Sequence, residues 1–576
     1  MRHLASVTVL SIMLLCELKF SSTKHVEDGY YDFIIVGAGS AGCVLARRLT
    51  EIHHWDVLLV EAGGEQPQWD LIPAYLTFAS DPAGGIDWNY KTVPSPNYCG
   101  GVSCPYPRGK CLGGPSSTNY MFYSRGSKSD YDELRRLGSK GWGYDEVLKY
   151  LIKSERNGDP RLASTKYHGS DGPLPVEKFS YQDENILAII QALKEFGLPE
   201  IEINGNQHLG AAVTQMTTHN GERQSTYTAF LEPVRGRNNL HIKTHSHVAN
   251  ILVRNNNEAY GIEYIRHNDT RRAFARKEII LSAGSIGTPH IHQLSGIGHK
   301  EVLEPLGINL IQELPVGYNL CDHVKASVGY RIKQTTQLPN ITQLYTNFLD
   351  YVAHRKGPLA APGTIQVVGF LPLENSFHPE ESHVELAFVP SVSNGLIPAS
   401  YYDGIVVTPT VLKPHSTGYV KINSTDPLVP PLILPNFLHN ESDVLIMLRA
   451  VNSSLELLKM PALRNLGFEA DTSVIPGCEQ HNWGSEEYWR CVIRITAKTV
   501  FHPVSTCKMG SRSDPTTVVD SELRVHNVTN LRVTDASIMP ITISGLNTLA
   551  IMIGEKGADI IKEEWRYYLN SSTFRT

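Results

Sequence analysis

One stretch near the start of the sequence, residues 31–64, limits the possible folds more than any other: YDFIIVGAGSAGCVLARRLTEIHHWDVLLVEAGG. Residues 33–36 form an apolar run of the length typical of a buried parallel strand, and residues 57–60 form a second one. A G-x-G-x-x-G motif follows the first run directly, with glycines at Gly37, Gly39 and Gly42. Apolar residues at helical spacing come next. This order of strand, turn, helix and strand predicts a Rossmann-like dinucleotide-binding unit.

Each part of this motif has a structural role. The first glycine permits a tight turn, the second lets a pyrophosphate approach the backbone, and the third lets the helix pack on the strand. The helix begins near Ser40, and we expect its N-terminus to meet the phosphates. Glu61 ends the second strand, next to Ala62, and its carboxylate can accept hydrogen bonds from ribose hydroxyls. An acid here disfavours NADP. The motif leaves NAD and FAD open, and its position near the N-terminus favours FAD.

Length and charge narrow the function classes. The chain has 576 residues, whereas a single domain usually stops growing at roughly 250–300 residues, so we expect two or more cores. The composition, 41% hydrophobic and 19% charged, is typical of a globular protein. The formal net charge of -6 and the lack of a basic run argue against nucleic-acid or membrane-surface partners.

The first residues predict a secretory signal peptide. Arg2 and His3 precede an apolar stretch, residues 4–16, which Glu17 interrupts. The stretch is shorter than the ~20 apolar residues of a membrane span and has the length of a signal-peptide core, ~7–15 residues. We therefore expect residues 1–22 to be a signal peptide and the protein to be secreted and extracellular.

N-glycosylation sequons also favour a secreted protein. Their asparagines are Asn268, Asn340, Asn423, Asn440, Asn452, Asn527 and Asn570. Their density in the second half of the chain is typical of a glycosylated surface.

The cysteines are consistent with an oxidising compartment. Cys99 and Cys104 flank a Gly-Gly turn, and Cys478 and Cys491 bracket a short polar loop, so each pair can form a disulfide. The alternative is that some of the cysteines are buried thiols, which we prefer for Cys43 in its helix and for Cys507. No C-x-x-C pair and no H-E-x-x-H motif supports a metal site.

Residues 109–119, GKCLGGPSSTN, resemble the first signature of the glucose–methanol–choline (GMC) oxidoreductase family. The resemblance implies FAD, alcohol oxidation, and a loop packed on the flavin through Lys110, Gly113, Gly114 and Asn119. The sequence departs from the signature at Pro115, which can reshape the loop because proline lacks an N–H. It also departs at Thr118, where some relatives carry a histidine bonded to FAD. Threonine cannot form that bond, so we expect non-covalent FAD.

Four further blocks extend the resemblance along the chain. Residues 284–298, GSIGTPHIHQLSGIG, match the second family signature, although His292 stands where an aliphatic residue is usual and is better interpreted as a structural histidine. Residues 244–265 predict a β-hairpin, in which the resemblance places a backbone contact from Val248 to adenine. Residues 530–565 return to the family pattern, with Asp535 and Ala536 near the flavin ring. "PVGYNLCDHV", residues 315–324, resembles the turn that leaves the flavin domain.

The segment FHPVSTCKMG, residues 501–510, supplies the candidate base. An alcohol must lose a proton from oxygen and a hydride from carbon, and a neutral imidazole suits the first task. The resemblance assigns it to His502 and assigns a second polar group, which positions the oxygen, to Asn547. The segment GLNTLAIMIGEK is one residue shorter than the usual family pattern. Alignment backwards from Gly554 places Asn547 at the family's catalytic position, whereas alignment forwards from Gly545 places Asn547 one residue away from it. No G-x-S-x-G turn supports a hydrolase.

Together these features predict an α/β fold with an α+β substrate part. A Rossmann-like FAD-binding domain is assembled from separated segments, residues 30–325 and 491–565, and an antiparallel-sheet substrate domain comprises residues 326–490, with some insertions in the first segment. The predicted function is that of an insect-type, secreted GMC enzyme that oxidises an alcohol to an aldehyde, ketone or lactone and passes electrons to O2 or a quinone-like acceptor. Three alternatives remain: an NAD-dependent dehydrogenase, an FAD-containing lyase, and a secreted non-catalytic binding relative.

Overall fold

The structure, a computed structural model, describes residues 26–80, 84–178, 184–333, 339–361, 365–372, 381–391 and 402–572. The predicted signal peptide, residues 1–22, lies outside the described residues, as does the side chain of Asn570.

The predicted dinucleotide unit forms as strand, helix and strand. It consists of β1 (Val26–Val36), α2 (Ser40–Leu49) and β2 (Val57–Val60), and β1 and β2 pair in parallel. β1 begins before the predicted apolar run because its first half, which is largely exposed, also pairs with a neighbouring strand through two register shifts. Only its last four residues are fully buried, and these are the residues that the apolar pattern marks.

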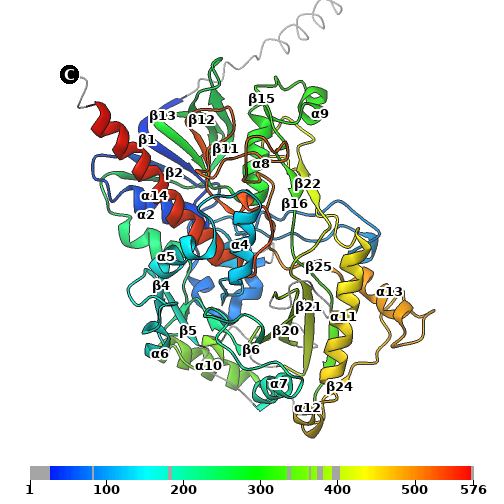
Figure 1. The fold of residues 1–576 in the computed structure, drawn as a ribbon. Helices are drawn as coiled ribbons and strands as arrows, with labels where there is room; N and C mark the ends of the chain where they lie inside the picture. The colour runs from blue at the N-terminus through cyan, green and yellow to red at the C-terminus, as the bar shows by residue number, and fades with distance from the viewer. Residues whose placement is uncertain are drawn as a thin grey trace, which may run out of the picture.

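The cofactor-side sheet collects strands from separated parts of the chain, as predicted. β10 (Leu240–Lys243), β13 (Asp269–Leu281) and β26 (Leu531–Val533) join β1 and β2 in parallel. The predicted hairpin is present as β11 (Ser246–Val253) and β12 (Ala259–Arg266), which extend the sheet in the order β10-β2-β1-β13-β12-β11. α2 and α14 (Leu546–Ser572) pack against each other beside this sheet (Figure 1).

Both faces of this sheet are buried. Ile34, Val36, Leu58 and Val60 belong to one apolar cluster, and the alternating residues, such as Phe33, Ile35, Val57 and Leu59, belong to another. Side chains of successive strand residues point to opposite faces, so a sheet covered on both sides needs the continuous apolar runs seen in the sequence.

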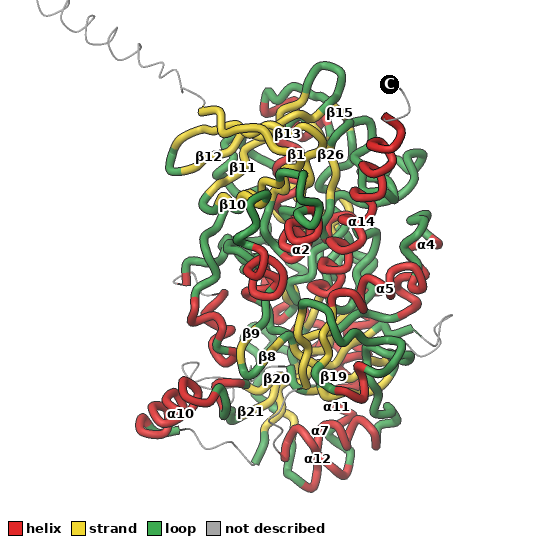
Figure 2. Tube along the Cα trace, turned by 90° about the vertical axis from the view of Figure 1, so that its left-hand side faces the viewer, coloured by secondary structure: helices red, strands yellow, loops and turns green. Residues whose placement is uncertain are grey.

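A second, antiparallel sheet forms the substrate side. Its order is β24-β18-β21-β20-β19-β6, and β17 and β25 attach beside β21. The strands are β6 (Gly210–Val213), β17 (Val324–Lys325), β18 (Val328–Arg331), β19 (Val367–Leu371), β20 (Val384–Ser391), β21 (Gly404–Val411), β24 (Glu469–Ala470) and β25 (Lys498–Thr499). The two sheets lie toward opposite ends of the molecule (Figure 2). β6, β17 and β25 come from the segments expected to belong to the cofactor domain. The domain boundaries stay a prediction.

The largest apolar cluster fills the space between this sheet and its helices, α7 (Glu184–Glu195), α11 (Glu441–Leu457) and α13 (Glu486–Thr496). The remaining helices are α3 (Pro115–Thr118), α4 (Lys128–Arg136), α5 (Tyr144–Ser154), α6 (Pro160–Ala163), α8 (Gly284–Leu294), α9 (Lys300–Leu303), α10 (Ile341–His354) and α12 (Pro461–Asn465). The remaining strands are β3 (Phe122–Tyr123), β4 (Glu155–Asn157), β5 (Leu174–Lys178), β7 (Gln215–Met216), β8 (Thr218–His219), β9 (Glu222–Arg223), β14 (Ile297–Gly298), β15 (Gln312–Glu313), β16 (Tyr318–Leu320), β22 (Gly418–Lys421) and β23 (Leu432–Leu434).

Two disulfides join the cysteine pairs that the sequence indicates, Cys99 with Cys104 and Cys478 with Cys491. Cys43 and Cys507 are buried free thiols, as preferred above. Within the described ranges, no helix combines the length and apolar character needed to cross a membrane.

Candidate active site

One cavity, with a volume of about 520 Å³, connects the glycine motif of the cofactor-side sheet with the second sheet and with His502. Most predicted cofactor residues line it: Gly37, Gly39, Ser40, Glu61, Ala62, Gly114, Asn119, Val248, Asp535 and Ala536. Three of them, Gly42, Lys110 and Gly113, do not line it. Both predicted catalytic residues, His502 and Asn547, are on its wall.

Glycines bring the two phosphate-side loops into contact. A Cβ on Gly114 would lie 2.8 Å from the Cα of Gly39, so the loop after β1 and the loop before α3 meet without side chains between them. Gly37 has φ 99° and a Cβ there would lie 2.5 Å from the Ser282 carbonyl oxygen. We call this surface the glycine cradle, formed by residues 37–40 and 113–114. It leaves backbone open to the cavity beside the N-terminus of α2, which favours an anionic phosphate.

Gly42, Gly113 and Lys110 do not line the cavity, and each has another structural role. A Cβ on Gly42 would lie 1.9 Å from the Gly37 carbonyl oxygen, so this glycine lets α2 pack on β1, as predicted. Gly113 has φ 90°, a left-handed conformation that a side chain would strain. Lys110 places its Nζ 4.6 Å from the centre of the Trp88 ring rather than facing the cavity.

Pro115 is accommodated without loss of a hydrogen bond. It occupies the first helical position of α3, whose N-cap is Gly114, and the first N–H groups of a helix have no intrahelical acceptor. Thr118, at the end of α3, lines the cavity.

Glu61 connects the turns that follow β1 and β2. Its carboxylate accepts hydrogen bonds from the N–H of Ala38 at 2.9 Å and from the N–H of Gly63 at 2.8 Å. The side chain is buried, and burial raises its pKa above the usual range. Glu61 therefore stands at the carboxyl end of β2, where the ribose of a dinucleotide is expected.

Asp535, which follows β26, fixes the start of α8. Its carboxylate accepts hydrogen bonds from the N–H of Ser537 at 2.8 Å, the N–H of Gly284 at 2.9 Å and the hydroxyl of Thr288 at 2.5 Å. Burial raises the pKa of Asp535. One side chain thus joins the second family signature to the C-terminal block.

His502 is held by residues that are far away in the sequence. Its backbone N–H donates to the Asp322 carboxylate at 2.9 Å, and its ring Nδ1 lies 2.9 Å from Nδ1 of His323. Asp322 also accepts from the Tyr106 hydroxyl at 2.5 Å and the Thr499 hydroxyl at 2.6 Å. This buried acid therefore anchors the segment that carries the histidine. We call His502 and His323 the histidine pair.

The environment of the histidine pair favours neutral rings. Burial, followed by the charges of His323, Arg108 and Lys325, holds the pKa of His502 well below its usual range. Burial also lowers the pKa of His323 to about 4. Arg108, whose guanidinium donates to the Phe501 carbonyl at 2.9 Å, is a nearby fixed positive charge. At neutral pH both rings are neutral, each with one N–H, and His502 can accept a proton.

Sequence reasoning missed His323, Asp322, Tyr106 and Arg108 as partners of the candidate base. The block PVGYNLCDHV contains Asp322 and His323, but we assigned it only a role as a turn. An adjacent acid and histidine in an otherwise weakly polar segment is the signal that could have marked them. The contact itself depends on pairing of β17 with β25, which brings residues 323 and 502 together.

Asn547 lies in the first turn of α14, at the glycine cradle. Its Oδ1 accepts a hydrogen bond from the Ser40 hydroxyl at 2.7 Å. The shortened loop before α14 therefore still delivers Asn547 to the cavity that His502 lines. Its bond to Ser40 places it beside the start of α2.

The other reactive side chains of residues 501–510 are structural. The Thr506 hydroxyl donates to the Ser285 carbonyl at 2.8 Å, and burial raises the pKa of Cys507 well above that of a free thiol. His292 is buried in α8, and its Nδ1 lies 3.1 Å from the Thr288 carbonyl and 3.8 Å from the Cys507 sulfur. Burial lowers the pKa of His292 to about 4, so the ring is neutral.

These residues fit FAD. The glycine cradle, the start of α2 and Glu61 provide the surfaces for pyrophosphate and ribose at one part of the cavity. The same cavity continues to Asp535, Ala536 and His502, so a long dinucleotide can reach the candidate base. Within the part of the chain that the structure describes, no group of three or more His, Cys, Asp or Glu side chains has an arrangement that could hold a metal ion.

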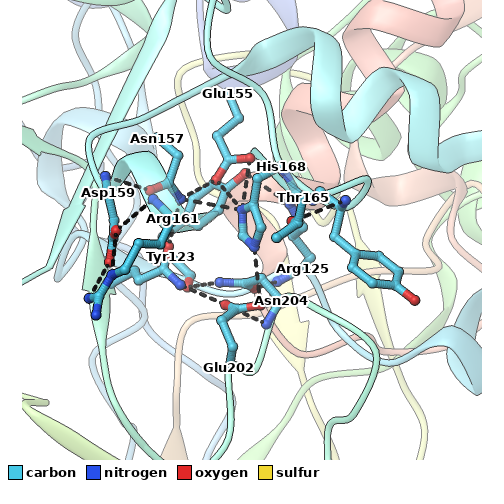
Figure 3. Close-up of polar contacts among 12 residues, drawn as sticks. Tyr123, Arg125, Glu155, Asn157, Asp159, Arg161, Thr165, His168, Glu202 and Asn204 are labelled. Atoms are coloured by element: carbon cyan, nitrogen blue, oxygen red, sulfur yellow. Dashed lines mark hydrogen bonds and ion pairs between the residues drawn. The ribbon is translucent and has the colours of Figure 1, made fainter. Parts of the chain in front are cut away.

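A separate polar cluster lies outside the cavity lining (Figure 3). His168 sits between two carboxylates: its Nδ1 is 2.9 Å from Glu155, and its Nε2 is 3.1 Å from Glu202. Arg125 pairs with the other oxygen of Glu155. Burial alone would lower the pKa of His168, but the hydrogen bonds to Glu155 and Glu202 raise it to about 9. The ring is therefore an imidazolium that joins two segments of the chain.

Comparisons with known proteins agree with this arrangement. The description of the N-terminal part of GMC oxidoreductases matches residues 31–325, and that of the C-terminal part matches residues 414–554. The chain is 37% identical over 565 residues to a glucose dehydrogenase [FAD, quinone] of Drosophila melanogaster, covering 96% of this chain and 89% of that protein. It is 32% identical over 566 residues to an ecdysone oxidase of Bombyx mori, covering 93% and 82%.

Solved structures show the same fold. A formate oxidase variant from Aspergillus oryzae RIB40 matches with a TM-score of 0.84 at 28% identity, covering 94% of this chain and 99% of that one. The pyridoxine 4-oxidase of Mesorbium loti matches with a TM-score of 0.79 at 27% identity, covering 92% and 98%.

Proposed function

The chain belongs to the GMC oxidoreductase family, and we propose that it is a secreted alcohol oxidoreductase in which His502 is the catalytic base. FAD is the cofactor of this family, and the enzyme acts on CH–OH groups. The observation that carries the proposal is the position of His502. A neutral imidazole, fixed by Asp322 and His323, lines the cavity that the glycine cradle also lines.

The residues that would hold FAD are those of the glycine cradle together with Glu61, Asn119, Val248, Asp535 and Ala536. When bound, FAD supplies a two-electron acceptor for the hydride that leaves the carbinol carbon. Thr118 lines the cavity but offers no atom for a stable covalent bond to the cofactor, which supports non-covalent binding.

His502 takes the hydroxyl proton of the alcohol. A neutral ring carries one N–H, and Nδ1 of His502 shares a hydrogen bond with Nδ1 of His323. We propose that His323 carries its proton on Nε2, so that its Nδ1 faces His502 without a proton. Nδ1 of His323 is then the acceptor and Nδ1 of His502 the donor. This leaves Nε2 of His502 free to accept the proton of the substrate.

Asn547 is proposed to orient the reacting oxygen. Its Oδ1 already accepts a hydrogen bond from the Ser40 hydroxyl, so its amide NH2 is the group that is available to the substrate. An amide N–H can stabilise the developing alkoxide as a hydrogen-bond donor. His502 of the histidine pair then takes the proton, and Asn547 holds the oxygen.

Secretion is supported by the surface of the protein. The described sequon asparagines are all exposed: Asn268, Asn340, Asn423, Asn440, Asn452 and Asn527. Two disulfides are also present, and disulfides persist mainly in oxidising compartments. Expression in insect cells should therefore yield a secreted glycoprotein that begins after residue 22. A mass spectrum that shows an intact N-terminus and no glycan would contradict this.

The electron acceptor is proposed to be O2 or a quinone-like compound. The similar proteins include a glucose dehydrogenase named for FAD and quinone and structures of oxidases. Anaerobic reduction followed by admission of air or of a benzoquinone distinguishes the two, because an oxidase is reoxidised rapidly by air alone.

The visible spectrum of the purified protein tests this function. We expect a flavin band near ~450 nm that primary alcohols bleach under anaerobic conditions. A folded protein without the band would contradict the FAD assignment. A band that no alcohol bleaches would instead favour the FAD-containing lyase or the non-catalytic binding relative.

A further inference from the structure

The antiparallel sheet contributes a wall of the cavity with two charged side chains of opposite sign. Lys325 of β17 and Glu385 of β20 both line the cavity, as does Thr410 of β21. Thr410 is paired with Lys325 on one side and with Glu385 on the other. Directly paired residues project from the same face of a sheet. Lys325, Thr410 and Glu385 therefore form one row across three strands, which we call the polar row.

The two charges of the polar row do not neutralise each other through contact. Neighbouring strands are about 4.8 Å apart, so Lys325 and Glu385 have Cα atoms roughly 10 Å apart. Within the described residues, neither side chain has an opposite charge within 4.0 Å. Burial lowers the pKa of Lys325 and raises that of Glu385 to about 7, and the charge of each opposes the shift of the other. Both groups thus face the cavity with unused hydrogen-bonding capacity.

The sheet around the polar row is apolar. Ala387 and Val389 of β20 and Val406 of β21 also line the cavity, and their side chains offer no hydrogen bond. Thr410 donates its hydroxyl proton to the Thr408 carbonyl at 3.3 Å, which leaves its oxygen as an acceptor. Thr408 of β21 also lines the cavity, but its hydroxyl donates to the Ala387 carbonyl at 3.2 Å. Among the described strand residues of this sheet that line the cavity, Lys325 and Glu385 are the charged ones, and a ligand group would meet a carboxylate, a hydroxyl and an ammonium along the polar row.

The polar row borders the histidine pair. Lys325 follows His323 by two residues, and β17 pairs with β25, which ends three residues before His502. The charge of Lys325 is among the causes that lower the pKa of His502. A substrate whose hydroxyl reaches His502 therefore extends along the polar row.

We propose that the polar row binds a neutral substrate with several hydroxyl groups, a polyol or sugar, through hydroxyls remote from the reacting carbon. The proposal rests on the alcohol oxidoreductase function above. A hydroxyl donates to Glu385 and accepts from Lys325 equally well. An aliphatic or aryl alcohol would leave both charges without partners in a desolvated site, which is unfavourable. A ligand with a single charge would be attracted by one end of the polar row and repelled by the other, whereas a neutral ligand meets no repulsion at either end.

The wild-type enzyme with matched alcohols provides a test that needs no mutation. Anaerobic flavin bleaching is measured with a hexitol or glucose, with analogues that lack one remote hydroxyl, and with butan-1-ol. We expect the bleaching rate constant divided by the apparent Kd to fall about 10-fold for each deleted hydroxyl that contacts the row, since hydrogen bonds to charged groups are strong. Butan-1-ol as the preferred substrate overturns the proposal.

Variants assign the effect to the row. Glu385→Gln and Lys325→Met should each lower that ratio about 10- to 100-fold for the polyol and less than about 3-fold for butan-1-ol. Matched controls are Glu469→Gln, on the exposed edge strand β24, and Lys459→Met, which is also exposed. An equal loss for both alcohols, or no loss for the polyol, overturns the proposal.

A binding measurement separates failure of the row from failure of the proposed function. In His502→Ala, the polyol is titrated against the flavin spectrum without turnover. The proposal requires a spectral change that saturates and that Glu385→Gln weakens about 10-fold or more in the double variant. Absence of polyol binding overturns the proposal. Binding without bleaching by wild-type enzyme leaves the row in place and contradicts only the alcohol oxidation.

Discussion

At the residue scale, the chemistry of His502 is set by groups that are distant in sequence. Asp322 holds its backbone, His323 meets its ring, and Arg108 holds the Phe501 carbonyl just before it. Burial and the nearby charges keep the imidazole neutral, and these contacts fix its position. The base is therefore a property of three chain segments that meet, and single substitutions in any of them should change its pKa or its orientation.

His323→Gln tests this positioning role. The glutamine removes the ring that holds Nδ1 of His502 and removes one cause of the lowered pKa of His502. The pKa of His502 should then rise, so activity, which needs the neutral ring, should disappear at a higher pH on the acidic side of the profile. We expect kcat to fall about 10- to 100-fold with little change in KM.

The pH profile of kcat/KM for wild type and His323→Gln is the measurement for that variant. His290→Gln is the matched control, because His290 is also a buried, cavity-lining histidine with a lowered pKa but makes no contact with His502 among the described residues. A loss of activity with an unchanged acidic limb would show that His323 serves only the fold.

Local motifs predicted part of this site and could not predict the rest. The glycines and Glu61 lie within one strand–turn–helix–strand unit, so their spacing in sequence dictates their spacing in the structure. The histidine pair depends on two short strands joined across more than a hundred residues. No periodicity in a single sequence encodes such a pairing, and for the same reason the polar row was not foreseen.

At the element scale, the position of α2 on β1 controls the shape of the glycine cradle. β2 has the bounds that its apolar run predicts, because a parallel strand that is buried on both faces has a continuous apolar sequence. α14 begins at Leu546, before its apolar run. Its first turn contains Asn547 and Thr548, and polar residues there do not contribute to an apolar periodicity.

Gly42→Ala should disturb this packing and release the cofactor. Its Cβ would lie 1.9 Å from the Gly37 carbonyl oxygen, and backbone cannot move aside as a flexible side chain can. Overpacking of this kind costs at least about 1–3 kcal/mol. We expect the flavin-to-protein ratio after gel filtration to fall markedly, with the far-UV circular dichroism retained.

Gly236→Ala is the control for that substitution. A Cβ at Gly236 meets nothing within 4 Å, so this variant should keep the flavin content of wild type. A Gly42→Ala protein that retains its flavin would show that α2 can shift without opening the cradle.

At the scale of the whole molecule, the cofactor-side sheet and the substrate-side sheet each draw strands from several parts of the chain. The sequence predicted this division into two sheets from four collinear blocks and a looser middle segment. It could not assign β6 and β25 to the second sheet, because short strands of two to four residues carry little pattern. Interactions between distant segments, such as the His168 cluster, then contribute to global stability.

The His168 cluster should make stability depend on pH. The pKa of His168 is raised to about 9 in the folded protein, above the value near 6.5 of an unfolded histidine. Its contribution is therefore complete below about pH 6.5 and is lost as the pH rises through about 9. His168→Gln should destabilise the protein by roughly 2–4 kcal/mol at pH 6 and much less at pH 10.

Apparent Tm values at one scan rate, between pH 6 and pH 10, test this dependence. His354→Gln is the control because His354 also pairs with a carboxylate, Asp350, but is exposed. A difference between wild type and His168→Gln that stays constant across this range would show that His168 is not an imidazolium in the folded protein.

The central claim, that His502 removes the proton of the alcohol, is tested most directly by anaerobic stopped-flow measurement of flavin bleaching in His502→Ala with saturating alcohol. The account predicts a variant that keeps its flavin and its flavin spectrum but is bleached about 10²–10⁴-fold more slowly than wild type. Bleaching at the wild-type rate would contradict the assignment of His502 as the base.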